Sequence, residues 1–226
     1  MATPVEQSAD RKTQLASTTI TKPTNLANGD VCGIWVIEYD NASPETPAIS
    51  GFTIPSGAGT IREATSNISN ATYLHRDIDG SEGASFSVTG LTGAVDLVAM
   101  RVTGTTTAKF QVAASSHNNN SSPSMPAIVL PNNNTLLLSI HVGYNDKATS
   151  TPTGWTADLA AFDGVNDTFH QAVTTASTVG PNSFTIAAGD AWISLIVAYS
   201  DTALATGPVA TIVAGSRAST RRAANW

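Results

Sequence analysis

The densest group of potential metal ligands in this 226-residue chain is the run Asp77-Ile78-Asp79-Gly80-Ser81-Glu82. Several carboxylate oxygens beside a glycine-enabled turn are what a hard cation such as Ca²⁺ requires. The run lacks the full calcium-loop spacing and the flanking helices. Asp-Gly between two strand-like segments is equally typical of a hairpin turn, whose tight geometry needs a positive φ. We therefore favour a turn over a calcium site.

The histidines and the single cysteine predict neither a metal centre nor a nucleophile. His75, His117, His141 and His170 are scattered, and a zinc site would need ligands that converge from distant segments. Cys32 lies in an apolar run, which favours a small buried hydrophobe over a reactive thiol. Nucleophile-elbow, Walker-type, zincin and dinucleotide-binding spacings are absent. The sequence thus predicts no catalytic, metal-binding or cofactor-binding residues, no cofactor, and a protein that is not an enzyme.

Aromatic residues offer one possible binding surface. Tyr39, Tyr144 and Trp155 lie near expected strand ends, where they could stack on a sugar ring beside the Asn145-Asp146 and 163–167 loops. Core packing is the competing interpretation and the one we favour, because it usually claims tryptophan and tyrosine for their large buried area. A polysaccharide-degrading enzyme would need paired carboxylates on a cleft, whereas the acids here are mostly in turn sequences.

The overall composition indicates strands. Only 12% of the residues are charged and threonine occurs 31 times, and threonine and serine suit the exposed face of a pleated sheet. The net charge of −6 argues against a nucleic-acid-binding surface. The first residues lack a secretory signal pattern, and the longest apolar stretch is too short for a membrane helix, so we expect a soluble protein.

Short apolar runs between Gly, Pro, Asn and Asp clusters predict an all-β fold. The segment Leu136 to Tyr144 alternates apolar and other residues, which predicts a strand buried on one side only. The expected strands are 18–21, 31–39, 48–54, 71–75, 84–88, 95–102, 109–113, 127–130, 135–144, 169–174, 183–186 and 192–199.

The two halves of the chain repeat one plan at an offset of about 100 residues, longer than a solenoid period. Gly51-Phe52-Thr53 recurs as Gly154-Trp155-Thr156, and Phe86-Ser87-Val88 recurs as Phe184-Thr185-Ile186. We expect one antiparallel, jelly-roll-like β-sandwich over residues 18–214. Its two pseudo-repeated halves would be residues 18–114 and 124–200, joined by a polar, turn-rich linker over 115–123. Two small tandem domains are the alternative.

Both ends of the chain are expected to be arms. Residues 1–17 are polar and without periodicity, which predicts an extended N-terminal arm in which Arg11 and Lys12 contact a partner. Residues 215–226 form a basic tail without acids, in which Arg217, Arg221 and Arg222 could dock on a negative neighbouring surface with Trp226 as an anchor. A solvated, frayed tail is the alternative.

Two elements resemble a known β-sandwich module. A β-sandwich module of bacteriophage virion and tail-fibre-associated proteins is similar to two parts of the chain. The first part contains Lys22-Pro23, Gly29-Asp30-Val31 and Ser50-Gly51-Phe52-Thr53, and the second contains Thr153-Gly154-Trp155-Thr156. The module's middle hairpin resembles Tyr73 and the stretch 80–87. The similarity covers roughly residues 18–200, and Phe52 stands where the module has tryptophan.

This resemblance implies a structural protein on the surface of a phage particle, made in the host cytoplasm. We expect a capsid decoration (cement) protein that bridges capsid subunits, with the major capsid protein as its partner. It would be a homo-oligomer, possibly a trimer, that binds neither nucleic acid nor membrane. A tail-fibre or receptor-binding component that recognises a host surface glycan is the alternative.

Overall fold

The computed structural model describes residues 3–39, 45–63, 69–93, 95–104, 110–120, 122–143, 148–159, 166–186 and 190–201. Within these ranges the chain is all-β, with one short 3₁₀ helix, η1 (Ser8–Asp10). None of the described helical structure is long and apolar enough to cross a membrane. The fold class predicted from the sequence, an antiparallel β structure consistent with a sandwich, is confirmed.

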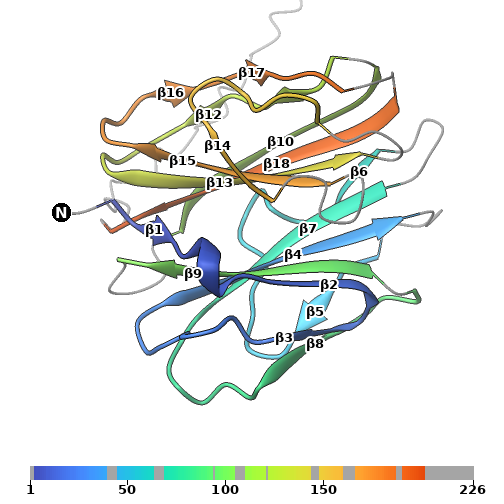
Figure 1. Cartoon of the computed structure of the whole chain (residues 1–226), viewed down its shortest axis with the longest axis vertical. Coiled ribbons are helices and arrows are strands. Elements are labelled where there is room, and N and C mark those ends of the chain that lie inside the picture. The colour runs from blue at the N-terminus through green and yellow to red at the C-terminus, as the bar shows by residue number, and fades with distance from the viewer. Residues whose placement is uncertain are drawn as a thin grey trace, which may run out of the picture.

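Two large antiparallel sheets and three small ones contain the described strands (Figure 1). The first large sheet consists of β1 (Val5–Glu6), β2 (Lys12–Ser17), β4 (Val31–Tyr39), β6 (Ile61–Glu63), β7 (Ser69–Asp77) and β9 (Val95–Thr103). The second consists of β10 (Phe110–Asn120), β13 (Thr135–Gly143), β14 (Thr156–Leu159), β15 (Asp167–Val173) and β18 (Asp190–Ser200). The small sheets pair β3 (Thr19–Thr21) and β5 (Ala48–Ile49) with β8 (Ser85–Thr89), β11 (Ser124–Met125) with β17 (Asn182–Ser183), and β12 (Ile128–Val129) with β16 (Thr178–Val179).

The sheets stack in four layers, with the two large sheets in the middle and the small strands outside them (Figure 1). A central core between the large sheets contains Trp35, Tyr73, Leu138, Leu195 and Tyr199, among others. An outer core lies on the far side of each large sheet. The long strands are therefore covered on both faces, which is why β4 and β13 are buried along almost their whole length.

The repeat in the sequence is a repeat in the topology. The order β9-β4-β7-β6 in the first sheet corresponds to β18-β13-β15-β14 in the second, with β2 and β10 as equivalent edge strands. The equivalent strand orders of the two stacked sheets run in opposite directions. At one edge β6 of the first sheet lies against β10 of the second, and at the other edge Arg11, just before β2, contacts Asp158 of β14. Two equivalent sheets thus share one central core.

The recurring Gly-aromatic-Thr elements are matching turns. Gly51 and Gly154 have φ values of +78° and +84°, a conformation that glycine adopts without strain. In each turn the aromatic amide donates to a carbonyl three residues earlier, over 3.0 Å for Phe52 and 3.1 Å for Trp155. Both aromatic rings then pack against the outer core of their own half. The repeated motif is explained by this packing.

A polar contact joins the halves inside the central core. The Tyr199 hydroxyl donates to the Tyr73 hydroxyl over 3.1 Å, and it lies 2.8 Å from Nδ1 of His75. Burial lowers the pKa of His75 to about 4, so this imidazole is neutral at pH 7. Gly33 makes room for the Tyr73 ring, since a Cβ at Gly33 would stand 2.0 Å from the Tyr73 oxygen.

Several sequence predictions are wrong. The expected strand 48–54 ends at Ile49, because the Gly51 turn follows it. Residues 136–143 are buried on both faces, because the outer strands cover the side that was expected to face solvent. Residues 115–120 of the expected linker belong to β10, which pairs with β18 from Phe110 to Asn120. An edge strand is held by its backbone ladder, so exposed Ser115 and His117 carry no apolar pattern that the sequence could show.

The described part of the N-terminal segment, expected to be an extended arm, is built into the first large sheet, with η1 between its two strands. β1 and β2 both pair with β9, in the registers Val5↔Thr103 and Lys12↔Ala99. Between them Asp10 accepts hydrogen bonds from Arg101 over 2.7 Å and from Asn25 over 2.9 Å. Backbone pairing and these ion contacts hold the segment in place, although its sequence has no apolar periodicity. The basic tail, residues 215–226, lies outside the described residues.

Candidate functional site

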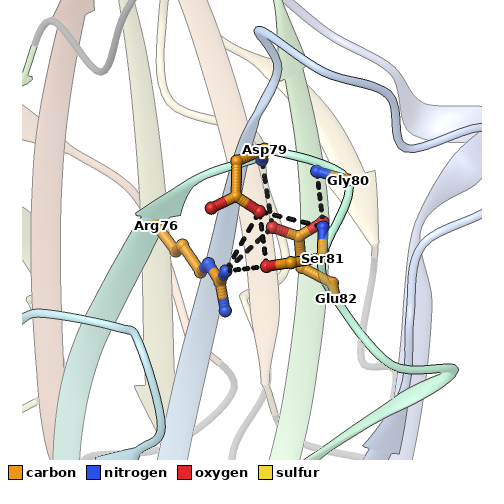
Figure 2. Close-up of polar contacts among 5 residues, drawn as sticks. All are labelled: Arg76, Asp79, Gly80, Ser81 and Glu82. Atoms are coloured by element: carbon orange, nitrogen blue, oxygen red, sulfur yellow. Dashed lines mark hydrogen bonds and ion pairs between the residues drawn. The ribbon is translucent and has the colours of Figure 1, made fainter.

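The acidic run closes around Arg76 (Figure 2). Nη2 of Arg76 lies 3.4 Å from Oδ1 of Asp79 and 3.1 Å from Oε1 of Glu82, and it donates to the Ser81 hydroxyl over 3.0 Å. The carboxylate of Glu82 accepts the backbone N–H groups of Asp79 and Gly80, at 3.1 and 3.0 Å. Gly80 has a φ of +85°. The run is a turn that binds its own arginine, and its oxygens point at donors of the same chain.

The electrostatics of this turn follow from its hydrogen bonds. The Ser81 hydroxyl and the Ser81 amide both donate to Oδ1 of Asp79, at 2.5 and 2.9 Å. These bonds favour the ionised carboxylate and lower the pKa of Asp79 to about 2. The guanidinium of Arg76 adds a smaller effect in the same direction. Asp79 is therefore an anion at any physiological pH.

Shallow, open depressions lie on both sides of Arg76. One, of about 380 Å³, is lined by Gly51, Thr53 and residues 75–77 with Asp79. The other, of about 300 Å³, is lined by Ser50, Phe86, the 81–83 turn and the hydroxyl groups of β8. Carboxylates, hydroxyls and one arginine could hydrogen-bond a polar ligand.

The described histidines have separate surroundings. His75 contacts Tyr199 in the central core, and His141 is fully buried with its ring edge-on to Phe184 at 4.7 Å. His117 is exposed on β10. His170 lies with its Nδ1 2.6 Å from Oδ1 of Asp158, and this contact raises its pKa. The pairing of His170 with Asp158 was not foreseen, because these residues meet only through the pairing of β14 with β15.

A cluster that the sequence did not indicate surrounds Arg11. Glu6, Asp158 and His170 offer ligand atoms within 4.8 Å of one another, a spacing that could hold a metal ion. Nη2 of Arg11 occupies the same space, at 2.7 Å from Oε2 of Glu6 and 3.4 Å from Oδ1 of Asp158. The guanidinium already supplies positive charge to both carboxylates, so we interpret the cluster as an ion network. The network consists of residues far apart in the sequence, so no spacing of residue types along the chain could have indicated it.

The residues expected to contact a partner lie in different surroundings, and some of them are outside the described part of the chain. The side chain of Arg11 is only 4% exposed and is committed to the ion network within the chain. Lys12 is half-buried at the start of β2. Arg217, Arg221, Arg222 and Trp226 lie outside the described residues.

Trp155 and Tyr39 pack on the core, as favoured from the sequence, and do not form the alternative sugar platform. Trp155 is 6% exposed and belongs to the outer core of the second half. Tyr39 packs against the central core, and its hydroxyl accepts a hydrogen bond from the Asn166 side chain. Tyr144, the pair 145–146 and residues 163–165 lie outside the described ranges. Cys32 is buried, as expected, and burial raises the pKa of its thiol.

Comparison with known proteins returns no match: no family model fits the chain, and no curated protein or solved structure is significantly similar to it.

Proposed function

We propose that this chain is a non-enzymatic structural protein of a bacteriophage particle, a capsid decoration protein that stabilises the head by bridging capsid subunits. The resemblance of the Lys22-Pro23 and Gly154-Trp155-Thr156 elements to virion β-sandwich modules motivates the viral setting. The observation that carries the structural role is the sharing of one core by two equivalent sheets. Such a body holds its shape without a cofactor, and it would act through surface contacts.

The charged groups of the described residues support the same proposal. The carboxylates of Asp10, Asp30, Asp79 and Glu82 all accept hydrogen bonds from the same chain. The arginines 11, 76 and 101 pair with these or neighbouring acids. Groups committed in this way fix the fold and would not act on a substrate.

Copy number tests this proposal. Calibrated mass spectrometry of purified particles should find the chain in a fixed ratio to the major capsid protein. A few copies per particle would contradict decoration and favour the tail. Absence from particles would refute the viral role altogether.

The basic tail supplies a second test. Deletion of residues 215–226 should reduce incorporation into particles, since Arg217, Arg221 and Arg222 form the cationic surface proposed to bind the acidic shell. Full incorporation of the truncated chain would remove the tail from the proposal while leaving the copy-number test intact.

Glycan recognition by a tail-fibre component is the second candidate. The depressions beside Arg76 favour it, because Asp77, Asp79 and Thr53 could bind sugar hydroxyls there. A glycan array would detect such binding, and Arg76→Ala with Asp79→Ala should abolish any signal. A glycan signal that both substitutions leave unchanged would place recognition elsewhere.

A further inference from the structure

The ion network around Arg11 lies where an edge of one large sheet meets an edge of the other. Glu6 is on β1, at the β9 edge of the first sheet, and Arg11 precedes β2 at that same edge. Asp158 is on β14, the edge strand of the second sheet, and His170 is on its neighbour β15. The two halves of the chain are therefore joined at this edge by charge, whereas apolar side chains join them in the interior.

The network is nearly closed to solvent. The side chains of Glu6, Arg11 and Asp158 are 0%, 4% and 4% exposed, while His170 is 30% exposed. Arg11 binds Glu6 with two hydrogen bonds, from Nε over 3.2 Å and from Nη2 over 2.7 Å. His170 is thus the member of the network that water and protons can reach.

The charge balance depends on His170. Two carboxylates, Glu6 and Asp158, face one permanent cation, Arg11. When His170 is protonated, the four groups sum to zero. When it is neutral, one negative charge remains in a site with little solvent to stabilise it, which costs free energy. Protonation of His170 therefore completes the network.

We propose that Glu6, Arg11, Asp158 and His170 form a proton-dependent latch that closes this edge of the two-sheet body. Protonation of His170 tightens the contact between β1 and β14, and deprotonation loosens it. Leu159, next to Asp158, packs against the central core, so a loosened latch gives water access to that core from this edge. The latch does not depend on the viral role of the chain.

The direction of the pH dependence follows from the neighbours of His170. Its hydrogen bond to Asp158 raises its pKa, and burial opposes that effect. Desolvation raises the pKa of Glu6. The Glu6 shift acts in the carboxyl range of pH, whereas His170 binds its proton more tightly in the folded chain than in the unfolded one. This contribution to stability is present in full below the ordinary histidine pKa and is lost as pH rises through the raised pKa of His170.

The η1 segment stays attached in both states. Asp10 and Asp30 bind Arg101 at 2.7 and 2.6 Å, and these contacts lie within the first half. The latch thus changes the contact between the sheets while the N-terminal segment keeps its place on β9.

Hydrogen exchange and NMR test the latch. In the wild-type chain we expect His170 to titrate above its ordinary pKa, and Asp158→Asn should bring that pKa down. Amide protection in β14 and β1, corrected for intrinsic exchange, should fall as pH rises through the His170 titration, by about tenfold for each unit of pKa shift. In His170→Gln, protection should be low at every pH.

His117→Gln is the matched control, since His117 lies exposed on β10 at the opposite edge. Amide hydrogen exchange in β14 of the His117→Gln variant should show the same pH dependence as in the wild type. The proposal is overturned if His170 titrates at or below its ordinary pKa, or if β14 protection in the wild type does not change with pH. A pH-independent loss of protection in His170→Gln, with no pH dependence in the wild type, would assign His170 a packing role only.

Discussion

Replacement of Gly33 by alanine would place a methyl group where the two halves of the chain meet. The new Cβ would stand 2.0 Å from the Tyr73 hydroxyl and 2.7 Å from Cζ of the same ring. Tyr73 is fully buried, its ring centroid lies 4.4 Å from that of Trp35 with the rings tilted by 48°, and its oxygen accepts the Tyr199 hydrogen bond. The ring therefore has no free space into which it could move.

The expected cost is the sum of two effects. Overpacking of a filled core costs about 1–3 kcal/mol, and loss of the hydrogen bond between Tyr199 and Tyr73 adds about 1 kcal/mol. Gly33→Ala should thus lower the free energy of unfolding by about 2–4 kcal/mol. Gly33 has no positive φ, so backbone strain does not contribute.

Urea or guanidinium unfolding followed by tryptophan fluorescence measures this cost. Gly93→Ala is the matched control, because a Cβ there has nothing within 4 Å and its φ is also not positive. Tyr73→Phe removes the oxygen at 2.0 Å, so Gly33→Ala should cost less in that background than in the wild type. Equal stabilities of Gly33→Ala and Gly93→Ala would refute the packing of Tyr73 against β4.

Three further predictions concern single side chains. Burial lowers the pKa of His75 to about 4, so the stability that the neutral imidazole contributes is complete above pH 6.5 and falls by about 3 kcal/mol toward pH 4. His75→Phe should remove this decrease in the free energy of unfolding at acid pH, and an unchanged decrease would contradict the prediction. The Ser194 hydroxyl is buried without a hydrogen-bond partner in the described part of the chain, so Ser194→Ala should leave the melting temperature unchanged or raised, and a clear decrease would reveal a missed partner. Ser81→Ala removes the 2.5 Å bond to Asp79 and should raise the pKa of that carboxyl measured by NMR, whereas an unmoved pKa would show that the amide bond alone sets it.

The long apolar strands could be predicted well from the sequence, because their side chains are buried and their pattern is strong. The expected ranges 31–39 and 95–102 match β4 and β9 within one residue. The recurrence of Gly51-Phe52-Thr53 as Gly154-Trp155-Thr156 indicated the repeat, and the structure explains it by equivalent turns, since each needs a glycine with positive φ and an aromatic ring for the outer core.

Edge strands and ion contacts were the parts that the sequence could not reveal. β1, β2 and residues 115–120 of β10 are stabilised by pairing with a neighbouring strand, which polar residues satisfy as well as apolar ones. The network of Glu6, Arg11, Asp158 and His170 joins residues from the two halves of the chain, so no local spacing marks it. Arg11 was accordingly expected at a partner surface, although its own chain buries it.

A density map of intact particles tests the decoration proposal most directly. We expect a body of two stacked sheets, repeated with the symmetry of the head and seated across boundaries between capsid subunits. Density for this chain only at the tail or its fibres would contradict the account.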